Sequence, residues 1–551
     1  MIKSFALTCL LAGTTMAAFS TQPVRRILVS DSNGAVSSVS LDSLGLARPG
    51  NGDTYCPYRT LQPADTRSFH TVSDDGLGRL GVSALGTLPS IGKQLIPVVL
   101  VEFADVSFQP STTIEHMNRQ FNEPGLRQNK SSRGSVRDYF VDQSYGKFTP
   151  QFEVLGQVKL SRPRSYYGAN EGNSKNANIY EFYNEALRLA QAKGMNFQRF
   201  VNGGAVPLVV FIFAGEGEHN SKTRGSEDYI WAHYKAEFTR INGVAFNSYF
   251  VGNELTPIYK RENGQVVMED GYPVVDHREP DGIGVLCHEL GHALGLPDFY
   301  STSGNPLDFQ TPDLFDVMDY GQYWNDGYAP MGYSAYERAC LGWLQPDELK
   351  VSNGHLRISP LAKPTAGTPN AYILRNPANS AEYYLLENRQ PSRWFPKGLG
   401  HGMLFYHIDY EPNRWEVNAV NTNRNHLRCS IVRADNVWQS AAVAQKLEEY
   451  RGDFYPGLNN VIEFSTESSP SLSWYQGNAR HRFYGMRTNE DSTMTFSYDD
   501  YTVTGLNKPK TEDAMRFAPL YELSGRRVSG TPRPNHIYIR EGKKIVLPST
   551  L

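Results

Sequence analysis

The stretch CHELGHALGLPDFY, Cys287 to Tyr300, places two histidines and a glutamate on one expected helix and an aspartate just beyond its end. At about 100° per residue, four apolar positions fall within about 60° of Ile283, and the five together form one buried stripe. These positions are Ile283, Leu286, Cys287, Leu290 and Leu294. His288 and His292 are four residues apart, so both imidazoles point the same way, off this stripe.

The residues after this helix predict a third metal ligand. Gly295 lets the backbone leave the helix in a left-handed conformation, and Pro297 prevents the helix from resuming. The turn then brings Asp298 back toward the imidazoles. A catalytic zinc takes three protein ligands and keeps an open position for water. The sequence therefore predicts one zinc ion held by His288, His292 and Asp298.

Glu289 lies beside the two histidines, and we expect it to be a general base and not a ligand. Zinc lowers the pKa of a coordinated water to about 7, so a nearby carboxylate can take its proton and pass it to the leaving amine. The alternative is an ordinary helix with two structural histidines. The full pattern of histidines, glycine and aspartate is expected by chance in roughly one in ten thousand chains, which favours the metal site.

Composition narrows the classes of protein to consider. The chain has 551 residues, 40% hydrophobic and 20% charged, which suits a globular protein of two or three domains. A formal net charge of -3 gives no basic field for nucleic acid, so we expect no nucleic-acid partner. Residues 1–20 have a positive start, a short apolar core and small residues, which is typical of a secretory signal peptide. No other apolar run reaches the roughly 20 residues of a membrane span, so we expect a secreted or cell-surface protein.

Sequence patterns divide the rest of the chain. Residues 21–90 are rich in turn signals and are expected to be a propeptide or N-terminal leader. In residues 91–345, apolar strands at 94–108 and 206–215 flank an amphipathic helix at 178–194, which predicts an α/β catalytic domain. A second helix at 333–344 begins with the capping pair Ser334 and Glu337. Short strands in residues 346–504 predict an antiparallel, β-sandwich-like domain.

The sequence resembles the immune inhibitor A family of secreted bacterial zinc peptidases, within the metzincin group, over roughly Val98 to Ser497. The matching landmarks are SVRDYFVDQSYGKF (135–148), FIFAGEGE (211–218), IWAH (230–233), FDVMDYG (315–321), GYSAYERACLGWL (332–344) and YYLLENRQ (383–390). The family motif ends in Gly-x-x-Asp, which matches Gly295 and Asp298. The resemblance implies a metzincin-like fold and a metalloendopeptidase acting on proteins or peptides. It assigns His288, His292 and Asp298 as ligands and Glu289 as base.

The same resemblance also implies roles for two residues in the turn around Met318. It implies that Met318 forms an apolar floor beneath the metal and that Tyr320 stabilises the oxyanion; the alternative is a packed aromatic ring. Relatives carry an Asp-rich, calcium-like stretch before the FIFAG strand. Here that stretch reads NFQRFVNGGAVPLVV and has no carboxylate ladder, so a Ca²⁺ site there is not supported, and other oxygen ligands could bind Ca²⁺ elsewhere.

Residues 505–551 resemble the sorting signals of type IX secretion substrates. LYELSGRRV and IYIREGKKIV fit a strand, a glycine turn, a basic patch and a second strand, and imply contact with secretion machinery. The alternative is a terminal β-hairpin.

Several other residues are weaker candidates for function. Cys56 could be a disulfide partner, an exposed thiol or a latency ligand, and Cys287 could be an inert buried thiol or bridge to Cys340. His233 and Glu254 could contact substrate, but a structural role is favoured. His407 is expected to face outward or to pair within the β domain. Two alternative functions remain. One is a narrow-specificity peptidase acting on glycoproteins or surface polymers. The other is a catalytically silent adhesin or polymer-binding protein, but such a protein has no need of the base Glu289.

Overall fold

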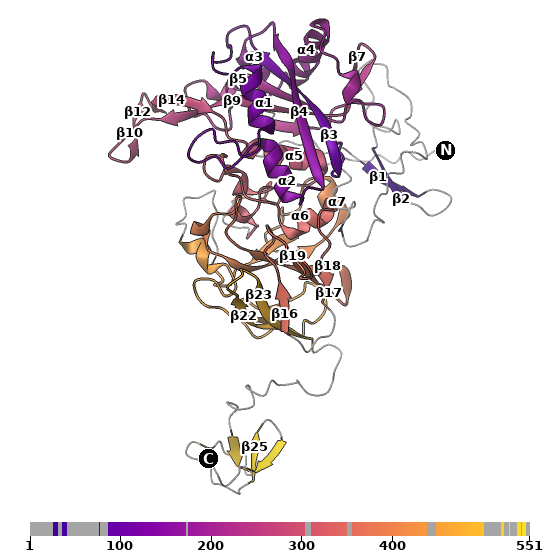
Figure 1. Cartoon of the computed structure of the whole chain (residues 1–551), viewed down its shortest axis with the longest axis vertical. Helices are drawn as coiled ribbons and strands as arrows, with labels where there is room; N and C mark the ends of the chain where they lie inside the picture. The colour runs from indigo at the N-terminus through magenta and orange to yellow at the C-terminus, as the bar shows by residue number, and fades with distance from the viewer. Residues whose placement is uncertain are drawn as a thin grey trace, which may run out of the picture.

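The computed structural model describes residues 76–77, 86–171, 175–303, 310–349, 355–437 and 448–500, and residues 26–30, 36–40, 520–522, 528, 537–540 and 543–546 near the ends. The expected signal peptide, Cys56 and most of the expected leader and tail lie outside the described residues. Figure 1 shows two large parts, which we call the first region (residues 86–345) and the second region (residues 346–500).

The first region is built on a mostly parallel sheet. Strands β9 (Tyr249–Tyr259), β5 (Val209–Glu216), β3 (Gly92–Glu102) and β4 (Phe148–Lys159) lie parallel in this order. Strands β14 (Val275–Pro280) and β6 (His233–Lys235) pair antiparallel with β9. Both faces of a parallel sheet are normally covered, which explains the continuous apolar runs read in the sequence.

Two cores lie on opposite faces of this sheet. Alternate residues of β3 point to opposite sides, so Val98 and Leu100 join one core while Val99 and Val101 join the other. Helices α1 (Ile114–Asn122), α2 (Val136–Gln143) and α5 (Gly284–Leu294) bury side chains in the first core. Helix α4 (Ile179–Ala192) and the short α3 (Arg164–Gly168) do so in the second. The expected strand, helix and strand at 94–108, 178–194 and 206–215 are confirmed as β3, α4 and β5.

The leader assigned to residues 21–90 is not separate from the first region at its carboxyl end. The Thr87 and Leu88 amides both donate to the Ala293 carbonyl at 2.9 Å. Leu88 is buried in the first core, and the Ser90 carbonyl accepts a 2.7 Å hydrogen bond from the Trp343 indole. Residues 86–90 thus pack against the end of α5, a contact between distant segments that local composition does not signal.

The second region contains two sheets. One has the order β15 (Asp347–Glu348), β17 (Ala371–Asn376), β18 (Asn379–Arg389), β19 (Gly402–Asp409) and β20 (Cys429–Val432). The other has the order β16 (His355–Ile358), β23 (Met494–Asp500), β22 (His481–Thr488) and β21 (Glu463–Ser465). All pairs are antiparallel except β15 with β17. A buried cluster that includes Leu386, Phe405 and Phe483 draws on both sheets.

The two regions share one core. On β19, Phe405 joins the cluster of the second region, whereas its neighbours Leu404 and Tyr406 join the same core as α5 and β3. Helix α6 (Ala335–Cys340) lies between the regions and has the expected capping box of Ser334 with Glu337. The predicted boundary near residue 345 is therefore a change of architecture and not a flexible linker.

Smaller elements complete the described chain. Pairs β10–β11 and β12–β13 lie with β14 in an arm that leaves the body of the molecule (Figure 1). At the carboxyl end, β24, β25 and β26 form a three-stranded antiparallel sheet, one strand more than the sequence pattern predicted. No helix among the described residues has the length and apolarity needed to cross a membrane.

The remaining bounds are β1 (Arg26–Ser30), β2 (Val36–Ser40), β7 (Thr239–Ile241), β8 (Val244–Phe246), β10 (Arg261–Glu262), β11 (Gln265–Val266), β12 (Met268–Glu269), β13 (Tyr272–Pro273), α7 (Pro412–Glu416), β24 (Leu520–Glu522), β25 (Ile537–Arg540), β26 (Lys543–Val546), and 3₁₀ helices at Gln198–Phe200, Ser226–Asp228, Asp313–Phe315, Tyr320–Tyr323, Lys397–Leu399 and Glu449–Gly452.

Candidate metal centre

Helix α5 carries the two histidines and is buried on all sides. The sequence predicts one buried stripe, yet every residue from Leu286 to Leu294 is buried. The additional burial comes from β6 and from the 3₁₀ helix Tyr320–Tyr323, which contact the helix. The helix ends at Gly295, whose φ of 106° is left-handed as expected. The Gly295 and Leu296 amides both donate to the Gly291 carbonyl, which turns the chain back toward the helix.

The turn brings Asp298 between the two imidazoles. Its Oδ1 lies 3.1 Å from Nε2 of His288 and 3.1 Å from Nε2 of His292. The two rings are nearly perpendicular, with an interplanar angle of 87° and centroids 4.8 Å apart. All three residues are buried. Among the described residues, this is the one group of three or more His, Cys, Asp or Glu side chains close enough to hold a metal ion.

The tautomers of both histidines suit a metal. Nδ1 of His288 lies 2.8 Å from the Val317 carbonyl, and Nδ1 of His292 lies 2.7 Å from the Leu296 carbonyl. A carbonyl oxygen only accepts, so each Nδ1 carries the hydrogen and each neutral ring keeps its Nε2 lone pair. His288 Nε2 and Asp298 Oδ1 are buried and have no hydrogen-bond partner within the described chain. Ligand atoms about 2.0–2.1 Å from a tetrahedral zinc lie about 3.3 Å apart, close to the spacing observed.

Charge in this cluster also favours a cation. Burial by itself raises the pKa of the Asp298 carboxyl, but His292 and His288 outweigh it and hold this pKa well below its usual value. Burial lowers the pKa of His292, while Asp298 and Glu289 raise it to about 9. A proton and a metal ion thus compete for the same nitrogen lone pair.

Glu289 lies on the same helix and has its own anchor. Its Oε2 accepts a 2.7 Å hydrogen bond from the Tyr234 amide of β6. Burial raises the pKa of Glu289, although His292, His288 and this hydrogen bond oppose the change. A carboxyl group with a raised pKa that is held beside a metal site suits proton transfer.

Met318 lies beneath the helix. A Cβ atom at Gly291 would come within 2.4 Å of Met318 Sδ, so the methionine packs against the helix at a residue without a side chain. Met318 is fully buried, and its carbonyl accepts a 2.9 Å hydrogen bond from the Phe299 amide, next to Asp298. Its position agrees with the apolar floor that the resemblance implies.

The Tyr320 ring packs on Tyr300 and on Tyr323, with ring centroids 6.4 Å apart in each pair. Burial and then Asp319 raise its pKa to about 12. The structure adds two tyrosines that the sequence reasoning missed. The Tyr300 ring stacks on the His288 ring, with centroids 6.4 Å apart. Burial and then Asp298 raise the pKa of Tyr300. Burial and then Glu289 raise the pKa of Tyr323.

A further missed residue comes from the second region. Asn418 forms two hydrogen bonds with Asp298, of 2.7 Å and 2.6 Å, across 120 positions of sequence. No local pattern signals such a contact.

His233, Glu254 and His407, the weaker candidates for function, all form contacts with other protein groups that suit a structural role. Nδ1 of His233 lies 2.8 Å from the Trp231 carbonyl, and Glu254 accepts hydrogen bonds from the Gln109 and Gly215 amides. Of the two alternatives for His407, pairing within the β domain is confirmed: the residue is buried and its Nε2 lies 3.0 Å from Glu382 Oε1.

The described cysteines are inert thiols. Cys287, Cys340 and Cys429 are all free and buried, so the alternative of a Cys287–Cys340 bridge is wrong. Burial raises the pKa of Cys287 and of Cys429 well above the usual value, which disfavours a reactive thiolate.

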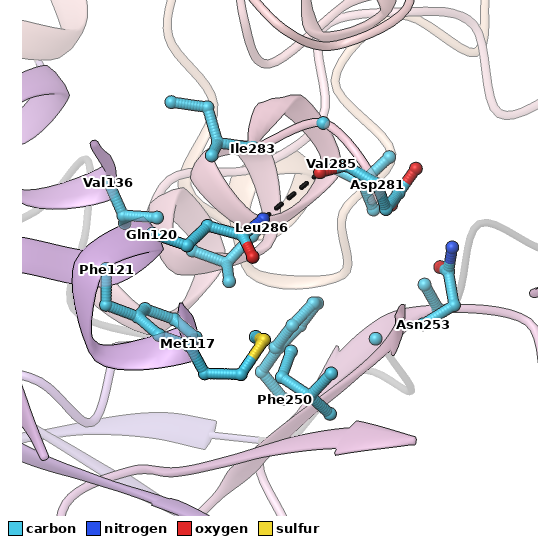
Figure 2. A pocket seen from close by; sticks show the side chains of 14 residues that line it. Met117, Gln120, Phe121, Val136, Phe250, Asn253, Asp281, Ile283, Val285 and Leu286 are labelled. Carbon is cyan, nitrogen blue, oxygen red and sulfur yellow. Dashed lines mark hydrogen bonds between the residues drawn. The ribbon is translucent and has the colours of Figure 1, made fainter. Parts of the chain in front are cut away.

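A small cavity lies at the first turn of α5 (Figure 2). Its volume is about 20 Å³, and it is enclosed by α1, β9 and the residues that begin α5. Phe250 and Met117 form an apolar side, while Asn253 and Asp281 lie at one end. A cavity of this size holds about one water, and neither the histidines nor Glu289 line it, so it is separate from the metal centre.

Comparison with known proteins supports a metallopeptidase. Residues 96–342 match the family described as "Immune inhibitor A peptidase M6, catalytic domain". The Pre-pro-metalloprotease PrtV of Vibrio cholerae serotype O1 (strain M66-2) is 24% identical over 251 residues, 40% of this chain and 25% of that protein. Immune inhibitor A of Bacillus thuringiensis subsp. alesti is 24% identical over 256 residues, 39% of this chain and 35% of that protein.

The matched segment includes most of β3, all of α5 and the Met318 turn. The chain spans about a quarter and about a third of the length of these two curated relatives. The M6 match and both relatives support a metalloendopeptidase domain within residues 96–342, and such a family implies a catalytic metal.

Proposed function

We propose that this protein is a secreted, zinc-dependent endopeptidase with a metzincin-like catalytic domain. The observation that carries the proposal is the buried tripod of Asp298 Oδ1, 3.1 Å from Nε2 of both His288 and His292. Two neutral imidazoles and one carboxylate are a donor set that catalytic zinc accepts. The M6 match, whose family acts on peptide bonds, supports the reaction class.

The roles of the side chains follow from their positions. A zinc ion held by the tripod would act as a Lewis acid, lowering the pKa of a coordinated water and polarising the substrate carbonyl. Glu289 receives the proton of the attacking water on its carboxylate and delivers it to the nitrogen of the leaving amine. The Tyr234 amide holds one oxygen of Glu289, which leaves the other for this transfer. Tyr320 donates a hydrogen bond to the developing oxyanion, as the resemblance implies.

The location of the protein is a separate part of the proposal. Residues 1–20 direct export, and residues 505–551 engage a type IX-like secretion system. The curated relatives, one of which is named a pre-pro-metalloprotease, support export. Protein and peptide substrates outside the cell follow from this location.

Glu289→Gln tests the mechanism. The amide keeps the size of the side chain but cannot take a proton, so we expect kcat to fall by about 10²–10⁴-fold while one zinc remains bound. Casein cleavage and elemental analysis measure the two properties, and 1,10-phenanthroline should abolish cleavage by the wild type. A zinc-loaded wild type that cleaves nothing in a diverse peptide library would instead favour the silent adhesin.

A further inference from the structure

Asn418 lies in the second region, in the segment that follows α7 and precedes β20. Its Oδ1 accepts a 2.7 Å hydrogen bond from the Asp298 amide, and its Nδ2 donates a 2.6 Å hydrogen bond to Asp298 Oδ2. The orientation of this side-chain amide is determined, because a backbone N–H only donates and a carboxylate only accepts. Both residues are buried.

The two oxygens of Asp298 therefore have different partners. Oδ1 lies 3.1 Å from both imidazole nitrogens, while Oδ2 is held by Asn418. A carboxylate with one oxygen held in this way cannot rotate freely about its terminal bond. Asn418 thereby fixes which oxygen faces the histidines and at what angle.

The backbone around Asp298 is held from the same side. Asn421 donates a 2.7 Å hydrogen bond to the Phe299 carbonyl and a 2.6 Å hydrogen bond to the Cys429 carbonyl of β20. Its Oδ1 accepts from the Arg428 and Cys429 amides. The segment 418–421 is thus tied to the sheet of the second region and carries that rigidity to Asp298 and Phe299.

The conformation of Asn418 suits this role. Its φ is 53°, in the left-handed region that asparagine tolerates better than most residues. The residue can therefore aim its amide back at Asp298 with little backbone strain.

We propose that Asn418 is a positioning residue, through which the second region sets the geometry and affinity of the metal centre in the first. This inference rests on the proposed zinc site. Hydrogen-bond partners of metal ligands typically contribute 10–100-fold to metal affinity. The second region would then be a part of the peptidase centre and not a separate appendage.

Asn418→Asp in the full chain tests the inference, since it keeps size and backbone preference but replaces the donor with a carboxylate facing Asp298 Oδ2. Asn418→Gly removes both hydrogen bonds and accepts the positive φ. Asn423→Asp is the matched control: it makes the same change of charge in the same loop, at an exposed residue whose Oδ1 accepts from the Asn425 amide and can still do so. Zinc affinity is measured by competition with a chromophoric chelator, and Tm with and without zinc.

We expect both Asn418 variants to bind zinc 10–100-fold more weakly than Asn423→Asp. The rise in Tm caused by zinc should shrink accordingly, because binding stabilises the folded state according to affinity. A role limited to folding would lower Tm equally with and without zinc, or unfold both variants, and either result overturns the inference. If wild type and His292→Ala bind zinc equally poorly, the proposed metal site fails as well. If His292→Ala loses zinc while the Asn418 variants bind it like the control, only the role of Asn418 fails.

Discussion

The first and second regions contribute to the candidate metal centre in different ways. In the first region, His288, Glu289 and His292 come from one helix, where a spacing of three or four residues places side chains on one side. In the second region, Asn418 reaches Asp298 from 120 positions away and depends on the packing of the second region against the first. Ligands that lie close in sequence can be assembled by a helix alone, whereas the support for the third ligand requires the whole fold.

The shared core explains why the two regions act together. Strand β19 sends alternate side chains to the second region's own cluster and to the core that contains α5. A movement of one region against the other would therefore expose apolar surface and displace Asn418 from Asp298.

The buried ion pairs of Arg433 should show the largest effect on the coupling between the regions. Arg433 follows β20, donates a 2.5 Å hydrogen bond to Asp453, and lies 3.9 Å from Asp313 in the loop that leads to Met318. Arg433→Met leaves two buried carboxylates without this cation, so we expect the free energy of unfolding to fall by about 3–5 kcal/mol. Urea denaturation measures the change.

Arg357→Met is the control for this experiment. Arg357 pairs with Asp491 within the second region, and both side chains are about half exposed, so its loss should cost much less than the loss of Arg433. Equal destabilisation by the two variants would contradict a special role for the contact between the regions.

A contact within the first region should have a smaller effect. In Gly291→Ala the new methyl group meets Met318 Sδ at 2.4 Å, and the methionine must move. We expect a net loss of about 1–3 kcal/mol in the free energy of unfolding, since overpacking outweighs the better helix propensity of alanine. Thermal or urea unfolding measures it.

A double-mutant cycle with Met318→Ala sharpens this test. If the methyl group and the methionine compete for the same space, Gly291→Ala/Met318→Ala should cost less than the sum of the single variants. Additive costs would show that the two residues do not interact.

The smallest expected effect concerns the tyrosines of the Met318 turn. Tyr320→Phe should lower kcat about tenfold with little change in KM, because only the transition state carries the negative charge that the phenol would stabilise. Tyr323→Phe is its partner variant, since after burial Glu289 is the largest influence raising the pKa of Tyr323, whereas for Tyr320 it is Asp319. A larger loss in Tyr323→Phe would assign the role to that residue.

Much of the first region could be predicted because its signals are local. Apolar runs at 94–108 and 206–215, the capping pair at Ser334 and the glycine that ends α5 each act within a few residues. The burial of α5 on all sides and the position of residues 86–90 depend on elements far away in sequence, and composition carried no sign of them.

The sequence by itself determined the helix, the direction of its two imidazoles and the turn that follows, because the geometry of a helix and of a left-handed glycine is set by neighbouring residues. Only the tertiary structure decided which oxygen of Asp298 faces those imidazoles and what holds the other. That choice depends on Asn418, which approaches Asp298 only when the second region joins the core that contains α5. Hydrogen bonds between distant segments have no sequence period, and they become visible only in the folded chain.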